Sequence, residues 1–309
     1  YTSHLIGLAV HKLGGTPWIA DTRDGWAVDE EEDFLRFEPD PKLRAKHRAM
    51  LARVVSSADQ YWSITPGIRD ATAERFPEEN PRKFAAVLQG FQEVDFQEQT
   101  QESREKGGGN LVIGYAGSFR PEVTPVEPFA AALAELKQGA PDLYKRLKFR
   151  VWGYQEGARE DKYRYLMETL KVYQVQDRIR HHASLPEKML IQALHGCDLL
   201  LVTNGRSSWT QKRLTTKLFT YLAARRPVLA LCVPGSDLDQ VVKNTGIGHT
   251  CPLDQPRCTV ELLVRWIERA GKGQRIPYTP DPKQLSPYSL EKGVKPLIRE
   301  HISRAAGLD

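Results

Sequence analysis

The sequence predicts an α/β protein whose parallel sheets are covered by helices on both faces. Its 309 residues suit about two domains of ordinary size. From residue 111 onward, short apolar segments alternate regularly with longer amphipathic ones, which is the pattern of strands followed by helices. The apolar segments at 111–116, 199–202 and 228–232 lack polar alternation, as expected of strands that are buried on both faces.

The first third of the chain has the same character but is less regular. We expect helices at 4–13, 42–55 and 66–76, and strands at 17–20, 60–65 and 84–88. Gly14 and Gly15 end the first helix, and Pro66 stands in the first turn of the third, where its missing N–H costs nothing. The acidic run at 29–33 is most simply a solvated loop.

A change of composition marks the boundary between the two domains. Residues 97–110 are rich in Gln and Glu, contain a run of glycines and show no apolar periodicity, which is typical of a linker. We therefore expect an N-terminal domain over 1–106, a second domain over 107–288 and a C-terminal helix within 289–309.

The second domain alternates strands and helices throughout. Strands are expected at 111–116, 149–152, 179–182, 199–202, 228–232 and 247–250. Helices are expected at 126–138, 162–170, 186–195, 214–224, 238–243 and 260–270, and a final one at 290–305. Ligands of such doubly wound sheets bind beyond the carboxyl ends of the strands, so the loops that follow the strands form the candidate site.

Composition and charge narrow the class of partner. Hydrophobic residues make up 40% of the chain and charged residues 27%, and no run of about 18 apolar residues is present to span a membrane. Residues 1–110 carry 14 Lys and Arg against 19 Asp and Glu, whereas residues 111–309 carry 30 against 20. A basic second half suits an anionic ligand such as a nucleotide diphosphate, although a solvated basic surface explains the charge equally well. The absence of a Lys/Arg block and of RNA-recognition or zinc-finger motifs disfavours nucleic acid.

The cysteines and the N-terminus bear on the cellular setting. Cys197, Cys232, Cys251 and Cys258 form no Cys-x-x-Cys pair, so we expect a reducing, cytoplasmic compartment and neither a disulfide framework nor a zinc site. No basic-then-apolar leader is present. The chain opens at Tyr1 and runs straight into a helical pattern, from which we expect that an N-terminal segment is missing.

The loop after the first strand of the second domain is the first candidate binding element. Gly117 ends this strand, and a glycine there lets a ligand approach the backbone closely. Ser118 and Arg120 could hold a phosphate. A tight turn from strand to helix is the alternative explanation of the same residues.

The loop after the third strand is the second candidate. Ser184 and Glu187 have the spacing of a helix capping box, which explains both residues structurally. That role does not exclude a contact between the backbone at Ser184 and Leu185 and a nucleobase. His181 and His182 are neighbours on the preceding strand and face opposite ways, so they do not form a metal site.

The loop at 203–217 is the third candidate, because it is polar and basic and runs into an apolar helix. Its cations are Arg206, Lys212, Arg213 and Lys217. A helix N-terminus with free N–H groups and nearby cations binds anions, which makes Asn204, Thr216 and Lys217 candidate ligands of a diphosphate. Thr215 and Thr216 can equally be plain N-caps.

Three side chains of the first domain are candidate catalytic groups. Asp21 and Asp24 follow a strand, where a carboxylate can act as a general base or orient an acceptor. Arg23 can instead pair with one of these acids, which would be a structural role. His4 lies one turn into the first helix and either faces a cleft or caps the helix.

The order of these motifs resembles that of bacterial family 4 (group 1) glycosyltransferases. The segments that carry the resemblance are PWIADTRDGW at 17–26, ITP at 64–66, LQGFQEVDF at 88–96, GYAGS at 114–118 and TKLFTYLAARRPVLA at 216–230. They span nearly the whole chain. No one of them is decisive, but the ordered set is fairly specific.

The resemblance implies the GT-B fold, in which two Rossmann-like domains face each other across a cleft. The first domain would be incomplete here, and the last helix would return to it. The donor nucleotide-sugar would be held by Gly117, Ser118, Arg120, Ser184, Leu185, Asn204, Thr216, Lys217 and Thr220. Catalytic groups would lie among Asp21, Asp24 and His4, and no metal or cofactor would be needed.

Three positions depart from the family pattern. Thr220 stands where members usually carry a glutamate that binds the donor ribose, and Lys212 stands where many carry a second glutamate. Ser118 replaces an arginine, so Arg120 or Lys217 would have to serve the diphosphate. A hydroxyl cannot replace a charge-assisted hydrogen bond between ribose and carboxylate at full strength.

Two functions follow as hypotheses. The first is a hexosyltransferase that moves a sugar from a UDP- or GDP-sugar to a glycan or lipid-linked acceptor in cell-envelope polysaccharide synthesis. It would work in the cytoplasm and at the inner face of the membrane, where basic residues could touch anionic lipid. The second is a non-catalytic nucleotide-sugar-binding module, prompted by Thr220 and Lys212. An epimerase is disfavoured because no carboxylate and histidine set is placed for proton abstraction.

Overall fold

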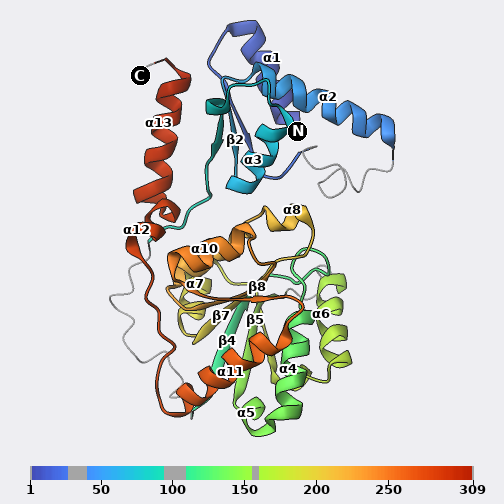
Figure 1. The fold of residues 1–309 in the computed structure, drawn as a ribbon, viewed down its shortest axis with the longest axis vertical. Helices are drawn as coiled ribbons and strands as arrows, with labels where there is room; N and C mark the ends of the chain where they lie inside the picture. Colours follow the sequence, from blue (N-terminus) through green and yellow to red (C-terminus); the bar gives the residue numbers. More distant parts are fainter. Residues whose placement is uncertain (1, 27–39, 94–108, 155–159, 308–309) are drawn as a thin grey trace. The chain divides into compact units, whose positions relative to one another are not determined.

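The computed structural model describes residues 2–26, 40–93, 109–154 and 160–307 and divides the chain into two compact units (Figure 1). The first unit comprises Tyr1–Gly90, Ser207–Leu214 and Ser286–Asp309. The second comprises Phe91–Arg206 and Thr215–Leu285. The boundary expected at residue 106 and the acidic run at 29–33 lie outside the described residues.

The first unit contains a parallel three-stranded sheet in the order β1-β2-β3. Its strands are β1 (Ile19–Thr22), β2 (Gln60–Ser63) and β3 (Phe84–Ala86). Its helices are α1 (Thr2–Gly14), α2 (Pro41–Ser57), α3 (Pro66–Arg75), the short α8 (Ser208–Gln211) and α13 (Lys295–Ala305). The expected helices and strands of this region are therefore present, within a few residues of their predicted ends.

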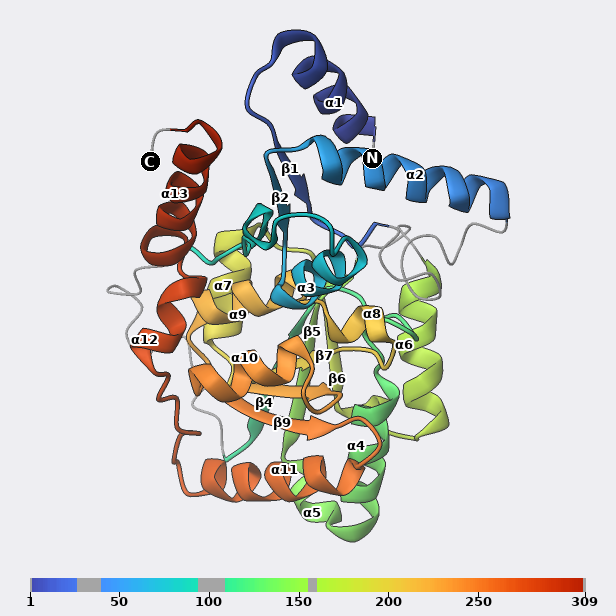
Figure 2. The same ribbon diagram turned by 45° about the horizontal axis from the view of Figure 1, so that its top comes forward.

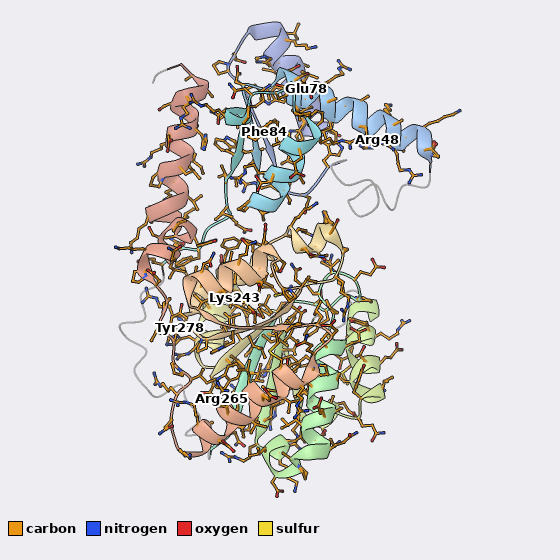
Figure 3. The ribbon with its side chains drawn as sticks, viewed as in Figure 1. Arg48, Glu78, Phe84, Lys243, Arg265 and Tyr278 are labelled. Carbon is orange, nitrogen blue, oxygen red and sulfur yellow. A yellow bond between two sulfur atoms is a disulfide. The ribbon has the colours of Figure 1, made fainter. Side chains whose placement is uncertain are left out.

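Apolar side chains cover both faces of this sheet. Tyr61 of β2 packs with Leu51 of α2, and the neighbouring Trp62 packs with Val294, which directly precedes α13. Adjacent residues on a strand point to opposite faces, so α2 and the C-terminal segment cover opposite sides. Phe84 of β3, labelled in Figure 3, joins the Tyr61 side.

Side-chain caps fix where two helices of the first unit begin. The Asp40 carboxylate accepts a hydrogen bond from the Lys42 N–H at 2.9 Å, at the start of α2. The Thr65 hydroxyl accepts one from the Ile68 N–H at 3.2 Å, and Pro66 occupies the first helical position of α3. Each such cap stabilises a helix by about 1 kcal/mol.

The second unit contains a six-stranded sheet in the order β6-β5-β4-β7-β8-β9, and every neighbouring pair is parallel. The strands are β4 (Leu111–Ala116), β5 (Leu147–Tyr154), β6 (Ile179–Ala183), β7 (Leu199–Thr203), β8 (Val228–Cys232) and β9 (Gly248–Pro252). The order reverses between β4 and β7, which is the switch point where ligands of such sheets bind.

Helices cover both faces of this larger sheet. They are α4 (Glu127–Gly139), α5 (Pro141–Lys145), α6 (Glu160–Val172), α7 (Glu187–His195), α9 (Thr216–Ala224), α10 (Asp237–Thr245), α11 (Pro256–Gly271) and α12 (Pro282–Leu285). Tyr115 of β4 lies in one core cluster with Phe129 of α4 and Leu263 of α11. The two helices α4 and α11 lie side by side in Figure 2. Gly114 faces Leu194 of α7 instead, so α7 lies on the opposite face.

The apolar strand segments at 111–116 and 228–232 are confirmed to the residue, whereas the helix expected from 214 begins at Thr216. Within the described part of the chain, no helix is both long enough and apolar enough to cross a membrane.

The cysteines correct one prediction. Cys251 of β9 and Cys258 of α11 form a disulfide, with their Cα atoms 5.8 Å apart, whereas the sequence predicted none. The strand ends at Pro252 and the helix begins at Pro256, so the short turn between them brings the two Cβ atoms together. Cys197 and Cys232 are buried free thiols. Burial raises the pKa of both thiols to about 12, so they are inert apolar side chains at neutral pH.

A single tyrosine hydroxyl joins the two central strands at their carboxyl ends. Tyr221 of α9 accepts a hydrogen bond from the Ala116 N–H of β4 at 3.0 Å and donates one to the Leu201 carbonyl of β7 at 3.0 Å. The side chain is fully buried. Its hydroxyl therefore satisfies two backbone groups that water does not reach.

Tyr221→Phe should lower the free energy of unfolding by about 1–3 kcal/mol, because it leaves the Ala116 N–H and the Leu201 carbonyl buried without this partner. Urea denaturation followed by circular dichroism measures the loss. Tyr173→Phe is the matched control, since the Tyr173 hydroxyl makes no hydrogen bond to any described residue and the variant should change stability little. Equal losses in the two variants would remove the structural role given to Tyr221.

Candidate functional site

Two glycines meet where β4 and β5 end. Gly117 follows β4 with φ +96°, and Gly153 lies near the end of β5 with φ +111°, both outside the range that other residues adopt readily. A Cβ added to Gly153 would lie 2.9 Å from the Gly117 Cα, closer than real atoms approach. The Gly117 N–H also donates to the Trp152 carbonyl at 2.7 Å. The backbone alone therefore forms the rim of the sheet at this point.

Lys217 extends from the first turn of α9 to this glycine rim. A Cβ on Gly117 would lie 3.0 Å from the Lys217 Cε and 3.4 Å from its Nζ. The same Nζ lies 5.4 Å from the centre of the Tyr115 ring, at the edge of cation–π distance. The structure thus brings together Gly117 and Lys217, two residues that the sequence analysis predicts to belong to one site.

The start of α9 has the features of an anion site. Thr215 occupies the N-cap position, but its hydroxyl makes no capping hydrogen bond. Side-chain capping therefore does not explain Thr215, whose carbonyl instead accepts a hydrogen bond from the Leu218 N–H at 3.0 Å. Thr216 and Thr220 are four residues apart and share one face of the helix, Thr216 exposed and Thr220 half-buried.

The loop after Gly117 is held by an aromatic hydroxyl and a threonine. The Tyr115 and Thr124 hydroxyls both donate to the Ser118 carbonyl, at 3.1 and 3.3 Å. The Arg120 N–H donates to the Thr124 hydroxyl at 3.0 Å. The guanidinium of Arg120 is exposed and makes no ion pair with any described acid. Ser118 thus has a structural role through its backbone, while the Arg120 side chain is available to a ligand.

A buried hydroxyl lies at the carboxyl end of β7. The Thr203 Oγ1 is buried and has no hydrogen-bond partner among the described residues. Its neighbour Asn204 is also buried, and the Asn204 N–H donates to the Leu231 carbonyl of β8 at 2.9 Å. A buried hydroxyl without a partner is unusual and points to a bound water or ligand at this end of the strand. Sequence analysis selected Asn204 but missed Thr203.

The loop after β6 differs from the prediction. Pro186, not Ser184, occupies the N-cap of α7, and no side chain caps this helix. Glu187 is the first helical residue rather than the third, which is why the predicted capping box does not form. Ser184 is exposed and Leu185 is half-buried. Because Ser184 does not cap the helix, the capping role is no longer an alternative explanation of this residue.

The two histidines of β6 face different neighbours, as predicted. His182 stacks on Trp152 of β5 with ring centres 5.0 Å apart, and His181 meets Tyr163 edge to face at 5.0 Å. Burial lowers the pKa of both rings, so they are mainly neutral at pH 7. No group of three metal-ligating side chains occurs among the residues that the structure describes.

The four cations of the 203–217 loop do not form one cluster. Lys212 and Arg213 belong to the first unit. There the Arg213 guanidinium pairs with Asp24 at 2.9 Å and stacks over the Trp209 ring at 4.0 Å. Arg206 and Lys217 belong to the second unit, where Lys217 contacts Gly117 from the start of α9. The basic residues of this loop are therefore divided between the two units.

Asp21 is the central acid of the first unit. One of its oxygens, Oδ2, accepts from Arg23 at 2.5 and 2.8 Å, which is the structural pairing considered for this residue. Its other oxygen, Oδ1, is buried and accepts no hydrogen bond within the described parts of the chain. A half-satisfied carboxylate at the carboxyl end of a strand remains a candidate acceptor of a proton.

His4 and Asp24 have different surroundings. The His4 ring stacks on Trp26 with centres 5.6 Å apart. Burial lowers the pKa of His4, while the negative charge of Asp21 acts in the opposite direction, so the two side chains share one environment. Asp24 is exposed and holds Arg213. The structure thus relates His4 to Asp21 but gives Asp24 a separate ion pair.

Comparisons with known proteins bear on the fold of the chain. No protein-family model matches the chain. It is similar to the probable glycosyltransferase WbjE of Pseudomonas aeruginosa, with 28% identity over 144 residues that cover 44% of this chain and 36% of that protein. Anabaena HepE in complex with UDP-glucose is similar in structure, with a TM-score of 0.67 and 13% identity over 98% of this chain and 76% of HepE. Sucrose-phosphate synthase from Thermosynechococcus elongatus is also similar in structure, with a TM-score of 0.68 and 14% identity. The match covers 99% of this chain and 72% of the synthase.

The chain has the GT-B fold. Its two parallel sheets with flanking helices are the two Rossmann-like units expected of that fold. The resemblance to group 1 glycosyltransferases that the motifs indicated is also confirmed. The matched segment spans little more than a third of the curated relative, and the ligand-binding residues of this GT-B chain stay a prediction.

Gly153→Ala should lower the free energy of unfolding by more than the strain of a positive φ accounts for. The added Cβ would lie only 2.9 Å from the Gly117 Cα. The conformational strain by itself is of order 1–3 kcal/mol. Gly235→Ala is the control, since Gly235 has φ +82° and nothing within 4 Å of the added carbon. Urea denaturation measures the free energy of unfolding of both variants. Equal losses of stability would show that the close contact between the two glycines does not add to the cost of the substitution.

Proposed function

We propose that the chain is a glycosyltransferase that takes its donor, a UDP- or GDP-sugar, at the carboxyl end of the second unit's sheet. The observation that carries the proposal is the contact of Lys217 with Gly117, at the start of a helix whose N-cap side chain makes no hydrogen bond. A cation and unhindered backbone beside the N-terminus of a helix form a site for a pyrophosphate. The acceptor is a glycan or lipid-linked saccharide of the cell envelope.

The comparisons support this donor class. HepE has been captured with UDP-glucose, with UDP, and with UDP and glucose. The trehalose-phosphate synthase of Burkholderia vietnamiensis, another structural neighbour, is UDP-forming. The lipopolysaccharide galactosyltransferase WaaB favours an envelope acceptor. These likenesses favour uridine over guanosine as the base.

Catalysis at such a site consists of positioning and of stabilising the departing diphosphate. As the bond from the sugar carbon to the phosphate oxygen breaks, negative charge accumulates on the leaving oxygen. Lys217 and the α9 N–H groups would face that charge, and Arg120 would add a second cation from the neighbouring loop. Gly117 and Gly153 allow the phosphates to approach the backbone because no side chain intervenes.

The first unit supplies the acceptor-side group. Asp21 is proposed as the general base or orienting group for the acceptor hydroxyl, through the Oδ1 atom that has no partner among the described residues. Arg23 fixes the carboxylate through Oδ2, and the neutral His4 ring lies in the same environment. Asp24 holds Arg213 and has a positioning role. We propose that the reaction takes place in the cytoplasm, at the inner face of the membrane, although the Cys251–Cys258 disulfide removes the argument from the cysteines for a reducing compartment.

Thr220 favours a second candidate function, a module that binds a nucleotide sugar without transferring it. Thr220 lies one turn beyond Thr216 on the same face of α9, where related enzymes carry a glutamate for the ribose. The two functions are separated by measuring UDP release from a panel of nucleotide sugars, with and without a lipid-linked saccharide acceptor. Binding without release would select the module.

Lys217→Ala should weaken UDP binding at least tenfold, because a charge-assisted hydrogen bond to phosphate contributes about 1.5–3 kcal/mol. Isothermal titration calorimetry with UDP and GDP measures the effect. Lys42→Ala is the control, since Lys42 is an exposed lysine at the same second position of its helix, α2. Undiminished UDP affinity in Lys217→Ala would contradict the donor site proposed here.

Asp21→Asn should reduce sugar transfer by about two to four orders of magnitude and leave UDP affinity unchanged, because an amide cannot accept the acceptor proton. UDP release in the presence of acceptor, together with UDP calorimetry, separates the two effects. Asp70→Asn is the control, since Asp70 forms a comparable ion pair with Arg69 at 2.7 Å. Full transfer activity in Asp21→Asn would exclude Asp21 as the acceptor-side group.

A further inference from the structure

Two adjoining cavities lie at the amino ends of the second unit's strands, on the edge of the sheet opposite to the donor site. Their volumes are about 110 and 350 Å³. They share Asp198, Arg275 and Ile276, so they form one recess, named here the amino-edge recess. Its outer wall is the segment that follows α11, which includes Tyr278, labelled in Figure 3. A volume of this size accommodates a small ligand.

The lining of the amino-edge recess is strongly cationic. Its positively charged side chains are Lys148, Arg150, Arg225, Arg226 and Arg275. Asp198 is the single acid among the residues that line it. The Asp198 carboxylate is also engaged, because its Oδ2 accepts from the Val112 N–H at 2.9 Å. The recess thus combines a large excess of positive charge with a concave surface.

Structural roles explain part of this lining. The Arg226 Nε donates to the His195 carbonyl at 2.5 Å and so satisfies the end of α7. Arg225 ends α9 in the left-handed conformation, with φ +52°. Glycine or asparagine usually occupies such a position, and another residue there costs about 1–2 kcal/mol. A strained backbone that presents an arginine to a cavity indicates a use for that arginine.

The guanidinium groups act on the same neighbours. Burial is the main cause that lowers the pKa of His195, and the positive charges of Arg226, Arg275 and Arg225 lower it further. Burial raises the pKa of Tyr278, and Arg225 and Arg226 oppose that rise. Arg225, Arg226 and Arg275 therefore lie close enough to act on the same residues. An anion bound among them would be attracted by several cations at once.

We propose that the amino-edge recess binds a phosphate group, with Arg225 and Arg275 as its principal ligands. Guanidinium groups suit this role because their paired N–H donors match two phosphate oxygens. The phosphate belongs either to a small phosphorylated solute or to the headgroup of a lipid. The site lies at the opposite edge of the sheet from Gly117 and Lys217, so it is distinct from the donor site and does not depend on it.

The test uses inorganic phosphate as the probe and calorimetry as the measurement. Phosphate is titrated into the full chain after saturation with UDP, so that UDP occupies the donor site. The titration is repeated on Lys217→Ala without UDP, because this variant lacks the donor-side lysine whether or not UDP binds. Arg225→Gln/Arg275→Gln should weaken phosphate binding at least tenfold. Arg257→Gln/Arg304→Gln is the matched control, because it removes two exposed arginines that pair with glutamates elsewhere. This control should bind phosphate as the unmodified chain does.

Three results would overturn the proposal. They are no phosphate binding by the unmodified chain, equal weakening in both double variants, and undiminished binding in Arg225→Gln/Arg275→Gln. Both substituted arginines are exposed, and circular dichroism checks that the variant folds. If it does not fold, Arg275→Gln alone replaces it, with a threefold or greater loss expected and no loss contradicting the site.

Vesicles distinguish the two sources of the phosphate. Sedimentation with phosphatidylglycerol vesicles that depends on Arg225 and Arg275, and is absent with phosphatidylcholine, supports a lipid headgroup. Saturable binding of free phosphate without sedimentation supports a small solute. A chain that neither sediments nor binds phosphate contradicts the proposal in both forms. If UDP does not bind, that result contradicts the donor site alone. The phosphate titration of Lys217→Ala needs no UDP, so it still tests the amino-edge recess.

Discussion

The contact between Gly117 and Gly153 is the constraint on which the second unit's candidate site depends. The two residues meet backbone to backbone at the ends of β4 and β5, and both have positive φ. No side chain can be inserted there without moving a strand. The end of β4 is consequently bare backbone, and Lys217 lies directly against it. Tyr221 fixes the same strand end to β7 through its hydroxyl, so the rim has a defined position on both sides.

Local charge at this rim comes from fewer groups than the basic composition suggests. Arg213 pairs with Asp24 and stacks on Trp209 in the first unit. Within the second unit, Lys217 contacts the rim from the first turn of α9, and the exposed Arg120 follows the same strand. Because dipole and lysine act at the same turn, one well-placed cation is enough to favour an anion.

The sequence was sufficient to predict the strands of both sheets, and the structure brings two of its candidate site residues, Gly117 and Lys217, into contact. Strands buried on both faces, such as 111–116 and 228–232, leave an uninterrupted apolar pattern that marks their ends. Gly117 and Lys217 were found because each stands beside a strand or helix end. Gly153 and Thr203 could not be found in this way, since their importance arises from neighbours that are distant in the sequence. The disulfide between Cys251 and Cys258 was missed because it depends on the turn after β9.

Helix α9 connects the two proposed anion sites and explains why their chemistry differs. Its nine residues span about 13 Å, with Lys217 in the first turn and Arg225 at the end. The dipole attracts an anion to the first turn and repels one from the last, so the same ligand meets opposite fields at the two ends. A single lysine is enough at the first end because the helix assists it. At the other end the helix opposes binding, and only several converging guanidinium groups, such as those of the amino-edge recess, can overcome that repulsion.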